Sequence, residues 1–298
     1  MVNSFEQQFL TTFSVEVTPK QVQKLGSLKS LLPSGTRVFI AHIDGTPIAD
    51  MVSCAKQLHE EGFSPVPHFP ARIIPSEKAL GDWIELYSRD AGVQEALVIA
   101  GGINGSNGPF TDSMQLLETG LFEKGGMQRL VVAGHPEGNK DIGERGVREA
   151  LDWKNDYAVR TGTQLSIATQ FAFEAQPVID WANRIAAEGN RLPVHIGVAG
   201  PAKLSTLVKY AAMCGVGASM RILTKQARNV TKLMSVRGPD DFVSDLARHK
   251  ADVSNSPIAG MHFFPLGGLA QTADWIASHR GGMFPQPGLG VESLQHIA

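Results

Sequence analysis

The chain has 298 residues, of which 43% are apolar and 19% charged, and this length suffices for one large domain or two ordinary ones. A formal net charge of -2 gives no positive field for nucleic acid or an anionic membrane, and two cysteines exclude a disulfide scaffold and a cysteine-based zinc site. No apolar run approaches the ~20 residues that span a bilayer, and the N-terminus lacks a signal-peptide pattern, so we expect a soluble cytoplasmic protein.

Eight short runs of β-forming residues alternate with longer helical patterns along the chain. The predicted strands cover residues 11–18, 37–43, 64–73, 95–102, 129–134, 164–171, 193–198 and 260–265. The segments between them carry apolar residues at helical spacing, as Ile48, Met51, Val52 and Ala55 do. This alternation predicts right-handed βαβ units, and eight of them fit a (β/α)8 TIM barrel that forms a single domain over residues 1–298. The alternative, a doubly wound sheet, usually has a glycine-rich turn after its first strand, where this chain has Thr18-Pro19-Lys20.

The 31 glycines and 17 prolines mark turns and do not form tracts. One set of glycines follows helical patterns and is expected to end helices: Gly62, Gly92, Gly162, Gly189 and Gly215. The segment 217–252 interrupts the alternation and predicts extra helices, rich in lysine and arginine, inserted before the last strand. Its basic part, residues 221–232, is interpreted as a solvated helix face, with an anion-binding lid as the alternative.

Chemistry in a barrel of this kind collects at the C-terminal ends of the strands. The first predicted strand carries Glu16 within an apolar, β-branched run. Burial in the barrel would raise the pKa of this carboxyl group, so that it could hold a proton near neutral pH and act as a general acid. A structural glutamate in a salt bridge is the alternative.

The second, third and fifth predicted strands end in His42, His68 and His135. Metal-dependent barrel hydrolases usually begin with a His-x-His pair, which this chain lacks, so we expect no metal. Hydrogen bonds to a ligand, or local contacts alone, are the interpretations that stay open for these histidines.

A glycine cluster follows the fourth predicted strand and includes Gly101, Gly102 and Asn104. Such a loop lets backbone N–H groups approach a phosphate or a flat ring, and an ordinary flexible loop is the alternative.

The sixth predicted strand ends in a segment that contains Gln170, Phe171 and Phe173. The amide of Gln170 suits the edge of a heterocycle, and the two rings suit stacking on a ligand. Core packing is the alternative for at least one of the rings, because neighbours on a strand alternate faces.

These strand-end motifs resemble, in order, those of the methylenetetrahydrofolate reductases in their short, bacterial-type form with a catalytic domain only. The matching segments are Phe13-Ser14-Val15-Glu16-Val17-Thr18-Pro19, Pro67-His68-Phe69, His135-Pro136-Glu137, Ala168-Thr169-Gln170-Phe171-Ala172-Phe173-Glu174 and His262-Phe263-Phe264. Together they span nearly the whole chain, from Phe13 to about His279.

The resemblance implies a barrel that reduces 5,10-methylenetetrahydrofolate to 5-methyltetrahydrofolate, with NADH or NADPH as the reductant and bound FAD as the intermediary. Glu16 matches the family's catalytic acid, and Gln170 matches the glutamine that meets the pterin, with Phe171 and Phe173 beside it on the substrate side. The positions expected to contact the flavin are His42, His68, Gly101, Gly102, Asn104, His135 and Lys154.

The chain departs from the family at three positions on the flavin side. The Arg-Gly-Asp after the fourth strand is replaced by Gly101-Gly102-Ile103-Asn104, the tyrosine before the His-Pro-Glu segment is missing, and Lys154 is offset in register. A flavin-free variant, a related folate-dependent one-carbon or demethylation enzyme, and a non-catalytic folate- or flavin-binding protein are therefore the alternatives. Retention of Glu16 argues against a pure binder, and the apolar outer helices would allow a homo-oligomer.

Overall fold

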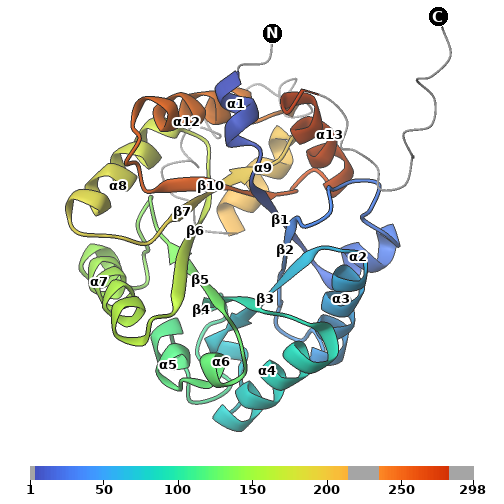
Figure 1. Cartoon of the computed structure of the whole chain (residues 1–298), viewed down its shortest axis with the longest axis vertical. Coiled ribbons are helices and arrows are strands. Elements are labelled where there is room, and N and C mark those ends of the chain that lie inside the picture. The colour runs from blue at the N-terminus through green and yellow to red at the C-terminus, as the bar shows by residue number, and fades with distance from the viewer. Residues whose placement is uncertain (1–3, 214–234, 282–298) are drawn as a thin grey trace, which may run out of the picture.

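The computed structural model describes residues 4–213 and 235–281, and its centre is a closed barrel of parallel strands. The strands are β1 (Phe13–Val17), β2 (Arg37–Ile40), β3 (Ser64–Pro70), β4 (Glu95–Ile99), β5 (Arg129–Gly134), β6 (Gln164–Ala172), β7 (Val194–Ala199) and β10 (Ile258–Phe264). Each pairs with the next along the chain, and β10 pairs with both β7 and β1 to close the ring (Figure 1). The predicted (β/α)8 barrel is confirmed, with every predicted strand present.

Helices surround the barrel and bury their apolar faces against it (Figure 1). They are α1 (Ser4–Phe9), α2 (Pro19–Leu25), α3 (Ile48–Glu60), η1 (Ala71–Ile73), α4 (Glu77–Ala91), α5 (Ser113–Glu118), α6 (Leu121–Lys124), α7 (Gly143–Thr161), α8 (Ala175–Ala187), α12 (Asp240–Asp252) and α13 (Leu269–His279). Gly92 and Gly162 end α4 and α7 in the left-handed conformation, as expected of glycines that follow a helix. Gly215 lies outside the described residues.

Extra structure does precede the last strand, as predicted. A short β8 (Ala202–Lys203) and helix α9 (Leu204–Met213) follow β7, and β9 (Val236–Arg237) pairs antiparallel with β8 before α12 begins. Helix α12 packs against α1 and α8 in the outer ring, whereas α9 packs against residues at the C-terminal ends of β6, β7 and β10. Of the predicted insertion, residues 217–234, including the basic part 221–232, lie outside the described part of the chain.

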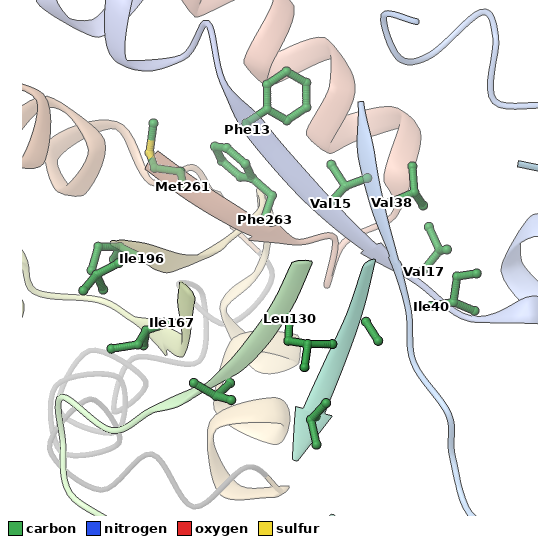
Figure 2. Close-up of a cluster of buried hydrophobic side chains, with 14 of the residues drawn as sticks. Phe13, Val15, Val17, Val38, Ile40, Leu130, Ile167, Ile196, Met261 and Phe263 are labelled. Carbon is green, nitrogen blue, oxygen red and sulfur yellow. The ribbon is translucent and has the colours of Figure 1, made fainter. Parts of the chain in front are cut away.

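Strand residues divide into two sets that face opposite sides of the sheet. Val15, Val17, Val38 and Ile40 belong to the core between strands and helices, which Figure 2 shows. A second cluster fills the barrel itself, and it consists of Phe39, Val66, Leu97, Val131 and Ala168. Because neighbours on a strand alternate faces, Glu16, which lies between Val15 and Val17, points into the barrel. The same argument places the side chains of His68 and His262 inside.

An ion cluster occupies the opposite, N-terminal end of the barrel. Glu95 is buried there and pairs with Arg37 and, at 3.5 Å, with Arg129. These three charged side chains therefore pair with one another, and the C-terminal ends of the strands lie at the other end of the barrel. We call that end, with the loops that follow the strands, the barrel mouth.

Candidate functional site

A carboxylate and two imidazoles from three strands meet inside the barrel mouth. Glu16 Oε2 lies 3.4 Å from His68 Nε2 on β3 and 3.6 Å from His262 Nε2 on β10. The Phe39 ring packs against both imidazoles, with centroid distances of 6.2 Å to His68 and 4.4 Å to His262. The Glu16 side chain is 24% exposed, so a molecule entering the mouth can reach it.

The electrostatic balance at Glu16 differs from the sequence-based expectation. Burial opposes ionisation of this carboxyl group, but the polar contact with His262 and the electrostatic attraction of His68 and His262 together outweigh it. The pKa of Glu16 therefore lies below its ordinary value, not above it as predicted. The raised pKa was expected because the apolar strand indicates burial, whereas the two histidines that stabilise the carboxylate lie on other strands. In the free protein at neutral pH, Glu16 is an anion.

The imidazole of His68 is electrically neutral at the same pH. Burial lowers the pKa of His68 to about 4, although the Glu16 carboxylate opposes this shift. Its Nε2 is buried and makes no hydrogen bond to any described residue. A buried ring nitrogen without a hydrogen bond, beside a carboxylate in the barrel mouth, makes His68 a candidate functional residue.

His262 and Ser14 complete this cluster, and the sequence did not mark either as a site residue. The Ser14 Oγ atom lies 2.8 Å from His262 Nδ1, and both residues are buried. Ser14 and His262 stand opposite each other in the pairing of β1 with β10. The available signal was the His262-Phe263-Phe264 motif on the last strand, read together with the rule that β10 must pair with β1 to close a barrel.

Gln170 sits in a bulge at the mouth end of β6. Ala168 pairs with His195 and Phe171 with Gly197, so that two residues of β6 stand against one of β7. The Gly197 N–H donates to Thr169 Oγ1 at 2.8 Å, which fixes the bulge, and a Cβ atom on Gly197 would lie 2.4 Å from the Gln170 carbonyl oxygen. The Gln170 side chain is exposed and free to meet a ligand.

The two phenylalanines beside Gln170 have different surroundings. Phe171 is buried, and its ring lies 5.5 Å from the Phe264 ring and 5.7 Å from the Phe173 ring, in a cluster beneath α9. Core packing thus accounts for Phe171. Phe173 is half-buried and lines a cavity of about 490 Å³ with Leu207 and Arg237. Contact of either ring with a substrate stays a prediction.

His42 packs against Trp83 of α4. Its Nε2 lies 3.0 Å from the Thr46 carbonyl oxygen, and its ring centroid is 5.2 Å from that of Trp83. Burial lowers the pKa of His42, against the effects of the Thr46 carbonyl and of Asp44. Its Nδ1 is buried and has no partner among the described residues.

Arg72 organises the glycine-rich loop after β4. Its guanidinium donates to the carbonyl oxygens of Thr111, Gly101 and Ile103 at 3.1, 3.4 and 3.3 Å, and its own carbonyl accepts from the Asn107 N–H at 2.7 Å. These hydrogen bonds tie the loop to Arg72. Gly101, with a φ of +94°, lies against Pro70.

The other two members of this loop face open space. A Cβ atom on Gly102 would meet nothing within 4 Å, and Asn104 is exposed. Both positions are open to solvent within the described part of the chain, so a ligand could approach either of them.

His135 and Lys154 interact at the mouth end of β5. Lys154 is buried on α7, and its Nζ donates to the Ala133 carbonyl oxygen at 3.1 Å. Burial lowers the pKa of Lys154 to about 8, although Asp112 favours the charged form. The pKa of His135 falls to about 4, because of burial and then because of the Lys154 charge.

These contacts bear on the cofactors that the sequence suggests. Holding the pyrophosphate of FAD requires donors directed at the ligand, yet the cations of Arg72 and Lys154 both donate to main-chain carbonyls. In this arrangement each of the two cations is already engaged within the protein, and neither is free to give all of its donors to that group. Within residues 4–213 and 235–281, no three histidine, cysteine or acidic side chains are grouped to hold a metal ion, and no helix is long and apolar enough to cross a membrane.

Comparison with known proteins adds a fold relationship. No protein-family model matches the chain. An uncharacterized protein from Clostridium thermocellum, described as binding two copies of 5-methyl-5,6,7,8-tetrahydrofolic acid, superimposes with a TM-score of 0.50 and 11% identity over 94% of this chain and 98% of its own. A protein from Streptococcus agalactiae described as the copper homeostasis protein CutC covers 68% of this chain and 94% of its own, with 17% identity and a TM-score of 0.39. The first shows a shared fold, and the second is too distant to support any argument.

Proposed function

We propose that the barrel mouth binds a reduced folate and that the protein reduces its 5,10-methylene group to a 5-methyl group, with NADH or NADPH as the reductant. The observation that carries this proposal is the Glu16 carboxylate, held between His68 and His262 at the reachable end of the barrel. Two further points support it. The strand-end motifs follow those of the methylenetetrahydrofolate reductases in order, and the ligand named for the Clostridium thermocellum protein is the product of this reaction.

The reaction needs one proton and one hydride. A proton delivered to the N10 amine breaks its bond to the methylene carbon and leaves an iminium cation at N5. Hydride from the dihydronicotinamide then adds to that carbon, which is reduced to a methyl group while the coenzyme is oxidised. Glu16 supplies the proton, and a positioned acid of this kind contributes about 10²- to 10⁴-fold to a rate.

Gln170 orients the folate in this proposal. Its exposed amide offers one acceptor and two donor hydrogens to the edge of the pterin. Phe173 lies three residues further along the chain and is half-buried, so part of its ring is available to the bound ligand.

We assign no step to a flavin. The resemblance predicts FAD, but the chain departs from the family at three positions on the flavin side, and the cations of Arg72 and Lys154 already donate to carbonyl oxygens. Together these observations favour direct transfer from the nicotinamide. Flavin absorption by the purified protein, or its appearance after incubation with FAD and desalting, decides between the two routes.

Product formation tests the proposed function. The protein is incubated with 5,10-methylenetetrahydrofolate and NADH or NADPH, with and without added FAD, and 5-methyltetrahydrofolate is measured by chromatography. We expect coenzyme oxidation and methyl product in equal amounts. Binding of 5-methyltetrahydrofolate without turnover under any of these conditions would make the protein a folate binder, and absence of binding would refute the proposal.

A further inference from the structure

The two oxygens of the Glu16 carboxylate have unequal surroundings. Both imidazoles approach Oε2, His68 at 3.4 Å and His262 at 3.6 Å, while Oε1 makes no hydrogen bond or ion pair within the described residues. The side chain of Glu16 is 24% exposed, against 8% for His68 and 2% for His262. A molecule that enters the mouth therefore meets the carboxylate before the imidazoles, and the free oxygen is Oε1.

Ser14 sets the orientation of the proton on His262. The Ser14 hydroxyl has one hydrogen to donate, and its oxygen lies 2.8 Å from His262 Nδ1 but 3.5 Å from the Met261 carbonyl oxygen. Ionised Glu16 has no hydrogen to donate, so the tautomer that suits this site has its hydrogen on Nε2, and Nδ1 accepts from the Ser14 hydroxyl. In this tautomer the ring carries its own hydrogen on Nε2, where it faces Glu16 Oε2.

His68 approaches the same oxygen from β3. Its Nε2 makes no hydrogen bond elsewhere among the described residues, and the Phe39 ring restricts the position of its imidazole. The titratable groups that act on Glu16 are His68 and His262, and the face toward β2 is covered by the uncharged Phe39. His42 affects Glu16 only indirectly, by opposing a positive charge on His68.

We propose that Ser14, His262 and His68 are positioning residues that hold Oε2 of Glu16 and leave Oε1 as the atom that meets the ligand, so that the proton Glu16 donates enters the site together with the folate. This inference rests on the proposed function. The empty site holds an anion, and a folate over Oε1 removes the water that solvates the charge, which favours the protonated form. One proton from the buffer then binds the carboxylate per folate bound. It passes to the folate amine in the reaction and leaves Glu16 ionised again.

The orientation of His262 is tested in the ligand-free protein. Long-range ¹⁵N–¹H NMR distinguishes the two imidazole tautomers, and His262→Gln identifies the signal by its loss. We expect the Nε2–H tautomer in the wild type and a mixture of tautomers in Ser14→Ala. A dominant Nδ1–H form in the wild type would overturn the positioning role, whether or not the protein binds folate.

Proton uptake is tested by calorimetry with 5-methyltetrahydrofolate as the probe. Titrations in two buffers with different ionisation enthalpies, over a series from about pH 5 to 8, give the protons bound per ligand. We expect uptake that approaches about one proton in the wild type and disappears in Glu16→Gln. Binding without uptake at any pH would overturn this inference and leave the proposed function standing, whereas absence of binding would refute the proposed function itself.

Two variants of His262 separate positioning from general structure. Glutamine places an amide N–H near the position of Nε2, whereas asparagine is too short to reach Glu16. We expect the pH midpoint of uptake to stay at the wild-type value in His262→Gln and to move upward in His262→Asn, because the anion then loses a stabilising donor. Equal midpoints in the two variants would contradict the role of His262, and NMR spectra confirm that each variant is folded.

Discussion

Ser14 and His262 are 248 residues apart in the chain, yet they stand opposite each other on neighbouring strands with 2.8 Å between Ser14 Oγ and His262 Nδ1. This contact crosses the seam at which the last strand closes the barrel against the first. Glu16 lies two residues after Ser14 on the same strand. The pairing of β1 with β10 that closes the barrel therefore also brings His262 next to Glu16.

Replacement of Ser14 by alanine tests this link through stability. The variant leaves His262 Nδ1 buried without a partner, which we expect to lower the free energy of unfolding by about 1–3 kcal/mol. Ser278 contacts His279 Nδ1 at 3.1 Å on the protein surface and provides the matched control. Urea unfolding should show little change for Ser278→Ala, because water replaces the lost contact. An equal decrease in the free energy of unfolding in both variants would show that the buried Ser14–His262 contact stabilises the protein no more than the surface contact does.

Gln170→Ala tests the folate site on β6. The side chain is exposed, so we expect an unchanged free energy of unfolding but roughly tenfold weaker binding of 5-methyltetrahydrofolate, for the loss of one or two hydrogen bonds. Gln164→Ala is the control, since Gln164 is exposed at the other end of the same strand. Unchanged folate affinity in Gln170→Ala would remove this residue from the site.

Gly197→Ala tests the bulge that positions Gln170. The new Cβ atom would lie 2.4 Å from the Gln170 carbonyl oxygen, and a backbone atom cannot move aside without breaking strand pairing. We expect thermal unfolding to report a loss of about 1–3 kcal/mol. Gly102→Ala should be neutral, because its Cβ atom meets nothing within 4 Å. A neutral Gly197→Ala would mean that the β6–β7 pairing tolerates a different register.

Lys154 gives a prediction for pH. Its pKa falls from 10.5 in the unfolded chain to about 8 in the folded protein, so the unfolded state binds more protons between these values. The free energy of unfolding of the wild type should therefore rise with pH in this range, relative to Lys154→Met, by about 3 kcal/mol in total. Urea unfolding of both proteins across the range measures the difference. Parallel pH curves would contradict the burial of a charged Lys154.

The barrel could be predicted from the sequence because the pattern of each strand and helix depends only on residues close together in the chain. The apolar runs around Val15 and Val38 and the helical spacing around Met51 are properties of adjacent residues, and the closed barrel follows once eight such units are counted. The inward orientation of Glu16 also follows from alternation along β1. What these patterns cannot give is the set of neighbours that another strand contributes.

The protonation of Glu16 shows that limit. The sequence around Glu16 indicates burial alone and hence a raised pKa. In the fold the pKa is lowered because His68 and His262, which lie on other strands, stabilise the carboxylate. His42 illustrates the same point, because its turn toward Trp83 depends on the position of α4. The bulge at Gln170 likewise depends on Gly197 of the next strand.

Single-turnover product formation by Glu16→Gln tests the central claim most directly. The isosteric amide cannot donate the proton, and it binds folate without proton uptake. We therefore expect 5-methyltetrahydrofolate to bind at least as tightly as in the wild type, while conversion of 5,10-methylenetetrahydrofolate with NADH or NADPH falls by about 10²-fold or more. Glu77→Gln, on the exposed first turn of α4, should convert at the wild-type rate. A Glu16→Gln protein that forms methyl product as fast as the wild type would contradict the account.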